Sequence, residues 1–234
     1  MDSRSIRSSY MLNTIRGWFG EKKTAATMWM SLNTSTYQRF HDLYIPTFHG
    51  TAQIDHLLIS PFGIFIVETK NHKGWIFGDR NSQQWTQLLF GKKYRFQNPL
   101  RQAYRQKKAL AAYFGIDEGL INTIVYFSGD CELKTELPAN VLNCSLARYV
   151  KRFKNIVLTE HEIDDLLLRV HQHIENSTTT RRQHVKDLRS RHNSTSVCPK
   201  CGSSLVKRVA RSGPNVGKAF LGCESFPQCR FTKN

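Results

Sequence analysis

Apolar and polar positions alternate along much of the chain in a way that predicts a mixed fold. Strand-like runs rich in β-branched and aromatic residues cover about 52–60, 63–70 and 74–78. The segment "WTQLLFGKKYRFQ" predicts a further hairpin that turns at Gly91. Before these strands, apolar residues at roughly helical spacing predict a first helix from near Gly20 to about residue 43.

The second half of the core continues with helix and strand signals. Asn98 and Pro99 supply an N-cap and a first-turn proline for a helix that Gly115 ends. "INTIVYFS" and "VLNCS" predict two strands, and Thr159 with Glu162 forms a capping box that opens a last helix. This order of elements favours an α/β or α+β core over a helical bundle or an all-β sandwich.

Charge is high and unevenly distributed. The chain of 234 residues has 34 lysines and arginines against 18 acidic residues, a formal charge of +16. Twelve of these cations lie in residues 177–234, against only Asp187 and Glu224. Such a balance predicts a polyanionic partner, with nucleic acid favoured over a charge that serves only solubility. The polar, basic stretch 177–196 is interpreted as a linker.

The N-terminus and the cysteines indicate the cellular compartment. No apolar run approaches the length of about 20 residues that crosses a bilayer, and the N-terminus lacks the apolar centre of a signal peptide. A cytoplasmic location without membrane association is therefore expected. Residues 1–16 are interpreted as an extension, and either Met1 or Met11 fits as the start. In a reducing compartment, four cysteines clustered in the last 37 residues point to a metal rather than to disulfides.

The hairpin "QIDHLLISPFGIFIVETK" places charged residues opposite one another. If "SPFG" is the turn, paired residue numbers sum to 123, so that Asp55 faces Glu68 and Gln53 faces Lys70. Opposed residues have Cβ atoms about 4.5–5.5 Å apart on one face of the sheet. The register thus predicts one cluster of two acids, an amide and an amine.

Two carboxylates at that distance are unfavourable unless a cation lies between them or one is protonated. Oxygen ligands at this spacing suit Mg²⁺ or Mn²⁺, which can polarise a phosphodiester and activate water. The alternative is a solvated cross-strand ion pair between Glu68 and Lys70. The apolar flank "IFIV" favours catalysis, because bare charges on a central strand need a reason.

These residues resemble the nuclease-related domain (NERD), a branch of the PD-(D/E)xK nuclease superfamily. The resemblance covers about residues 17–130 and depends on Glu21, the hairpin and "QNPLRQ". It implies a restriction-endonuclease-like core, a mixed sheet flanked by helices. By resemblance, Asp55 and Glu68 would be metal ligands together with the backbone carbonyl of Thr69.

The same resemblance assigns roles to four further residues. Lys70 would be the catalytic lysine, and Glu21 an outer-shell or second-metal acid from the first helix. Gln53 would be a supporting polar group. By the same resemblance, Gln102 lies where related nucleases use a glutamine to contact substrate. A first-turn glutamate favoured by the helix dipole is the alternative for Glu21.

The tail is a second motif. Cys198 and Cys201 form C-x₂-C, and Cys223 and Cys229 form C-x₅-C. Four thiolates suffice for one tetrahedral Zn²⁺, which a segment this short needs in order to fold.

"SGPNVGKAFLGCESFPQC" resembles the four-cysteine zinc ribbon of bacterial type I topoisomerases. That resemblance implies binding to DNA, often single-stranded, by cations that contact phosphates and by phenylalanines that stack on bases. The residues expected in these roles are Arg208, Arg211, Lys218, Phe220, Phe226 and Arg230.

Together these patterns predict an extension at 1–16, a NERD nuclease-like domain at 17–176, a basic linker at 177–196 and a zinc ribbon at 197–234. The expected function is metal-dependent cleavage of DNA. A non-catalytic DNA-binding adaptor and an RNA-directed protein are the alternatives, and the sequence leaves open endo- versus exonuclease action and the oligomeric state.

Overall fold

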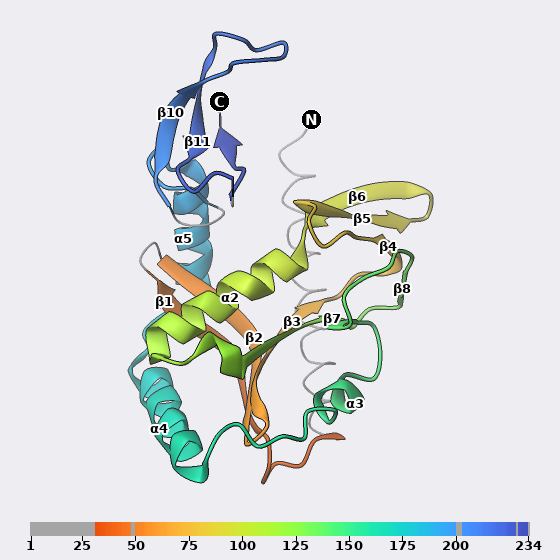
Figure 1. Cartoon of the computed structure of the whole chain (residues 1–234), viewed down its shortest axis with the longest axis vertical. Helices are drawn as coiled ribbons and strands as arrows, with labels where there is room; N and C mark the ends of the chain where they lie inside the picture. The colour runs from red at the N-terminus through yellow and green to blue at the C-terminus, as the bar shows by residue number, and fades with distance from the viewer. Residues whose placement is uncertain (1–30, 48–49, 200–202, 228, 234) are drawn as a thin grey trace. The chain divides into compact units, whose positions relative to one another are not determined.

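The computed structural model describes residues 31–47, 50–199, 203–227 and 229–233, in two compact units (Figure 1). The first unit comprises the described residues up to Leu43 together with Gln53–Ser177. The second comprises Tyr44–Ala52 and the chain from Thr178 onward. None of the described helices is long and apolar enough to span a membrane.

The first described strand, β1 (Gln38–Thr47), corrects the prediction of a helix that runs to about residue 43. The residues of that helix before Ser31 lie outside the described part of the chain. Asn33 begins a turn there, since its side chain accepts a hydrogen bond from the Ser35 backbone N–H and its carbonyl accepts one from the Tyr37 N–H. An asparagine that bonds its own neighbouring backbone competes with helix, and the alternating residues that follow favour strand.

The main sheet has the order β1-β2-β3-β7-β9. Its other strands are β2 (Gly50–Ser60), β3 (Gly63–Lys70), β7 (Ile121–Phe127) and the short β9 (Val141–Leu142). β2 and β3 are antiparallel, whereas β3, β7 and β9 run parallel. The sheet is therefore mixed, as predicted. β3 is buried on both faces from Gly63 to Thr69, which explains its continuous apolar sequence.

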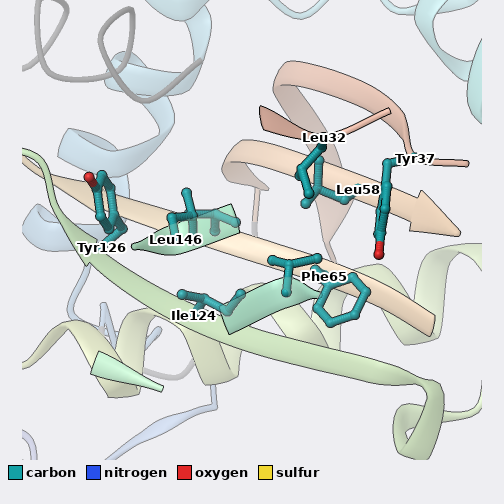
Figure 2. Packing of buried hydrophobic residues seen from close by; sticks show 9 residues of the cluster. Leu32, Tyr37, Leu58, Phe65, Ile124, Tyr126 and Leu146 are labelled. Atoms are coloured by element: carbon teal, nitrogen blue, oxygen red, sulfur yellow. The ribbon is translucent and has the colours of Figure 1, made fainter. Parts of the chain in front are cut away.

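Helices pack on both faces of this sheet. α3 (Leu146–Val150) packs with Phe65 of β3 and Ile124 of β7, in the cluster of buried side chains drawn in Figure 2. On the other face, α2 (Pro99–Phe114) places Ala103 against Val125 and Phe127. As predicted, the Asn98 side chain caps α2, and Gly115 ends it in the left-handed conformation with φ 61°.

A second sheet, of order β6-β5-β4-β8, belongs to the same unit. It contains β4 (Gly74–Phe77), β5 (Gln84–Leu89), β6 (Lys92–Gln97) and β8 (Cys131–Leu133). Trp85 anchors it to the core: its ring is 1% exposed and stacks on Phe127, with centroids 6.2 Å apart.

The remaining elements are short or helical. A 3₁₀ turn, η1 (Glu118–Leu120), precedes β7, and α4 (Glu160–Asn176) opens with the predicted capping box. The expected linker contains a helix, α5 (Arg181–Asn193), that the composition did not predict. The zinc-ribbon segment forms a three-stranded antiparallel sheet of β10 (Leu205–Val209), β11 (Ala219–Cys223) and β12 (Thr232–Lys233).

Candidate active site and cysteine cluster

Asp55 lies on β2, one residue beyond the last pair of the ladder between β2 and β3. The ladder pairs Ser60 with Gly63 and continues to His56 with Val67, so the predicted register is confirmed over five pairs. One step further, the Thr69 backbone N–H donates to Asp55 Oδ2 at 2.9 Å. Both residues are 8% exposed. The carboxylate is thus held on the backbone of the neighbouring strand, next to Glu68.

Glu68 is the more deeply buried acid, with 1% of its side chain exposed. Its two oxygens have different donors: Lys70 Nζ lies 2.5 Å from Oε1, and Gln106 Nε2 lies 2.5 Å from Oε2. A buried carboxylate requires such compensation, because unpaired charge in an apolar interior is costly. The ion pair of Glu68 and Lys70, which the sequence analysis gave as the alternative, is present, but Glu68 is buried and not solvated.

Lys70 connects the acids to helix α2. Its side chain is 21% exposed, and Nζ donates to Gln102 Oε1 at 3.0 Å as well as to Glu68. The structure therefore brings Gln102 to the ammonium group, one turn of helix before Gln106. Two partners fix the direction of the amine while part of the side chain remains accessible to solvent.

Gln106 is a site residue that the sequence analysis missed. It is 3% exposed, and Nε2 also donates to the backbone carbonyl of Gln53 at 2.8 Å. Its Oε1 is buried with no hydrogen-bond partner among the described residues. The available signal was its spacing: residues 102 and 106 share a helix face, and Ala103 and Leu110 beside them face the core.

Of the remaining predicted residues, Gln53 has another position and Glu21 is not described. Gln53 contributes its backbone carbonyl to Gln106, while its side-chain amide donates to Asp42 Oδ1 at 3.1 Å. Its side chain therefore points toward β1 and not toward Lys70, and the ladder between β2 and β3 ends at His56, before it reaches residue 53. Glu21 lies outside the described residues.

A histidine pair lies next to the acids in sequence. His41 of β1 and His56 of β2 approach with their Nδ1 atoms 2.7 Å apart, so one nitrogen donates and the other accepts. Burial, followed by repulsion from His41, lowers the pKa of His56 to about 3. The pair is thus neutral at pH 7.

The donor set of the acidic cluster fits a hard divalent cation. Two carboxylates and a backbone carbonyl on the neighbouring strands β2 and β3 are oxygen ligands of the kind that Mg²⁺ and Mn²⁺ accept. Gln106 Oε1, buried without a partner in the described part of the chain, offers a hydrogen-bond acceptor for a water beside such an ion. Asp55, Glu68 and the Thr69 carbonyl are the groups that could hold it.

The second unit gathers cysteines. The sulfur atoms of Cys198, Cys223 and Cys229 all lie within 4.8 Å of one another, and those of Cys198 and Cys229 are 3.7 Å apart. Tetrahedral Zn²⁺ at about 2.3 Å from each thiolate would separate the sulfurs by about 3.8 Å, so the trio fits the ion. All three residues are buried with Leu205. Cys201 lies outside the described residues.

A groove of about 670 Å³ lies on the same unit. Five of the six residues expected to bind DNA line it, whereas Lys218 instead donates to Asn215 Oδ1 at 3.3 Å. The Arg208 guanidinium lies 5.8 Å above the Phe226 ring, which is 57% exposed. The lining residues are Lys207, Arg208, Val209, Arg211, Phe220, Gly222, Cys223, Phe226, Arg230, Phe231 and Thr232.

The fold and these clusters define a mixed α/β domain followed by a small cysteine-rich ribbon. Comparison with protein families gives the same division. The model of the nuclease-related domain matches residues 16–128, and that of the topoisomerase DNA-binding C4 zinc finger matches residues 195–234. The chain thus contains a nuclease-related domain and a topoisomerase-type C4 zinc finger.

Two curated proteins are similar to parts of the chain. An uncharacterized protein of Bacillus anthracis is 42% identical over 96 residues, which cover 40% of this chain and 45% of that protein. DNA topoisomerase 1 of Methanothermobacter thermautotrophicus is 54% identical over 35 residues, 15% of this chain and 4% of the topoisomerase. The chain therefore matches less than half the length of either relative. No solved structure has significant similarity to it.

Proposed function

We propose that the chain is a metal-dependent deoxyribonuclease whose zinc ribbon holds DNA. The observation that supports it most is the buried carboxylate of Glu68, next in sequence to the residue that binds Asp55 and ion-paired to Lys70 at 2.5 Å. Acids and an amine grouped in this way on a nuclease-related domain are the groups that phosphodiester hydrolysis needs. A location in the cytoplasm belongs to the same proposal.

Each residue of the candidate active site would have its own role in the proposed hydrolysis. Asp55, Glu68 and the Thr69 carbonyl would hold Mg²⁺ or Mn²⁺, which polarises the phosphate and lowers the pKa of a water. Lys70 donates from Nζ, so it can orient the attacking water or stabilise charge on the phosphoryl oxygens. Gln102 keeps that amine in place through its 3.0 Å hydrogen bond. Glu21 would add a further acid from the first helix.

In this proposal, the zinc ribbon provides the affinity for DNA. Four thiolates, with Cys201 as the fourth, would hold the structural Zn²⁺. The groove beside them has cations for phosphates and the exposed Phe226 ring for stacking, a combination that suits single-stranded DNA. The topoisomerase-type zinc finger supports DNA as the polymer. Competition between matched DNA and RNA strands tests this preference.

The proposal is tested by cleavage. Purified protein is incubated with Mg²⁺ or Mn²⁺ and single-stranded, duplex or branched DNA. We expect cleavage that is lost in Asp55→Asn and in Glu68→Gln. Absence of cleavage with every substrate, or cleavage that persists in both variants, would refute the assignment.

A non-catalytic DNA-binding adaptor is the second candidate. It is favoured by the contacts of the acids with Thr69, Lys70 and Gln106, which compensate both carboxylates without an ion. Titration calorimetry separates the two proposals. A nuclease binds Mg²⁺ more tightly than its Asp55→Asn variant does, whereas an adaptor gives the same weak signal in both.

A further inference from the structure

The hairpin of β5 and β6 has an unusual turn. Leu89 pairs with Lys92, so Phe90 and Gly91 alone form the loop. Both have positive φ angles, 49° and 73°. Two-residue turns of this kind favour asparagine or glycine at the first position, and a bulky aromatic residue with positive φ is strained. Phe90 is also 95% exposed, so no burial offsets that strain.

The hairpin and the helix that follows it, α2, form a basic segment. Residues 80–116 contain eight lysines and arginines and no acidic residue. Lys92, Lys93 and Arg95, all exposed on β6, take part in none of the ion pairs of the described residues. Lys93 also lies in one cross-strand row with Leu88 and Trp75, whose ring is 45% exposed. A polyanion is the partner that such a surface fits.

The hairpin is also joined to the candidate active site. Six residues in each strand, at about 3.4 Å per residue, make an arm of about 20 Å. Figure 1 shows it extending beyond the start of α2 in the same unit. β6 ends one residue before Asn98, the cap of the helix that positions Gln102 and Gln106. DNA along this arm would therefore lie next to the first turn of the helix that supports Lys70 and Glu68.

We propose that the β5–β6 hairpin is a duplex-DNA contact of the nuclease-related domain, with Phe90 inserted as a wedge between base pairs. Two-stranded ribbons enter DNA grooves, and apolar wedges that unstack a base step kink the duplex by about 20–90°. The three cations hold the phosphates that flank the groove. The inference rests on DNA being the substrate of the proposed function, and it adds a second contact outside the zinc ribbon.

The experiment uses the full-length, zinc-loaded chain with Asp55→Asn, without added Mg²⁺ or Mn²⁺, so that the DNA stays intact. The probe is a 30-base-pair duplex labelled at both ends for energy transfer. We expect binding to raise transfer through the kink. Phe90→Gly should abolish the kink and weaken binding about tenfold, while the fold is kept because glycine suits the turn.

Charge removal gives a second readout. Replacing Lys92, Lys93 and Arg95 by glutamine should lower the slope of log K against log salt by about 2–3. The matched controls lie in the segment after α3. Ile156→Ala removes an apolar side chain that is 74% exposed, and Lys151→Gln with Lys154→Gln removes two exposed charges. Ile156→Ala should leave kink and slope unchanged, and the double variant should leave the kink unchanged.

The result that overturns the inference is a kink and an affinity that survive Phe90→Gly. A sedimentation coefficient that falls with Phe90→Gly would also overturn it, since Phe90 would then join two copies of the chain. Failure of the nuclease proposal gives a different result. If the chain kinks DNA through Phe90 but cuts none, the hairpin contact stands and the nuclease proposal fails. If it cuts DNA without kinking it, the nuclease proposal stands and the hairpin contact fails.

Discussion

Gln106 offers a direct test of how the buried carboxylate of Glu68 is supported. Gln106→Ala removes the 2.5 Å hydrogen bond to Glu68 and the 2.8 Å bond to the Gln53 carbonyl. A hydrogen bond to a charged group contributes about 1.5–3 kcal/mol and a neutral one about 1 kcal/mol. Since Gln106 is 3% exposed, water replaces these bonds poorly. We therefore expect a loss of about 3 kcal/mol in the free energy of unfolding.

Gln102 is the matched control, one helical turn away. It is half-buried and makes one 3.0 Å hydrogen bond, to Lys70. Because solvent can replace that bond, Gln102→Ala should cost less than about 1 kcal/mol. Gln106→Met, which fills a similar space, separates the hydrogen bonds from the cavity, and we expect it to recover only a minor part of the loss.

Tryptophan fluorescence during urea unfolding measures this difference. All four tryptophans precede residue 90, so the signal reports on the nuclease-related domain and not on the zinc ribbon. In the cleavage assay, Gln106→Ala should lower the rate about 10–100-fold, as expected for a residue that positions a metal ligand. Equal unfolding free energies for Gln106→Ala and Gln102→Ala would refute the view that Gln106 compensates buried charge.

Four further predictions concern other parts of the molecule. The pKa of about 3 for His56 lies below its unfolded value of about 6.5, so stability falls as pH drops through 6.5; urea unfolding should show a loss of about 2 kcal/mol from pH 7 to 5, smaller in His56→Asn. Asp55→Asn keeps an acceptor for the Thr69 N–H, so thermal unfolding should show it to be about 1 kcal/mol more stable than Asp55→Ala, although neither variant cuts DNA. A zinc chelator should unfold the ribbon, measured by circular dichroism, and leave tryptophan fluorescence unchanged; a ribbon that keeps its structure would exclude a folding role for the metal. In the intact protein, exposed Cys144 should react with a thiol reagent at pH 8 while Cys131, whose pKa burial raises to about 11, reacts slowly.

Local patterns predicted the elements around the candidate site. The turn after Ser60 fixes the hairpin register because each side chain must keep its face of the sheet, and that register is confirmed. The cap at Asn98 and the stop at Gly115 likewise depend on neighbouring residues only. Such features are encoded within a few positions of the chain.

Contacts between residues far apart in the chain could not be predicted from the sequence. Gln106 meets Glu68 across 38 positions, and nothing in a single helix distinguishes it from an exposed glutamine. Helix α5 has no apolar stripe, and its buried ring, His184, approaches Thr51 at 2.5 Å across 133 positions. Asn33 ended the expected first helix because its side chain turns the backbone before β1.

The second unit is discontinuous in the chain: Tyr44–Ala52 is included in it together with the C-terminal part. Thr51 and Tyr44 both meet His184, the latter with ring centroids 5.3 Å apart. Cutting the chain at residue 177 would therefore separate Tyr44–Ala52 from the C-terminal residues that it packs against. A graft of the C4 zinc finger together with α5 onto another protein therefore has to provide a substitute for Tyr44–Ala52.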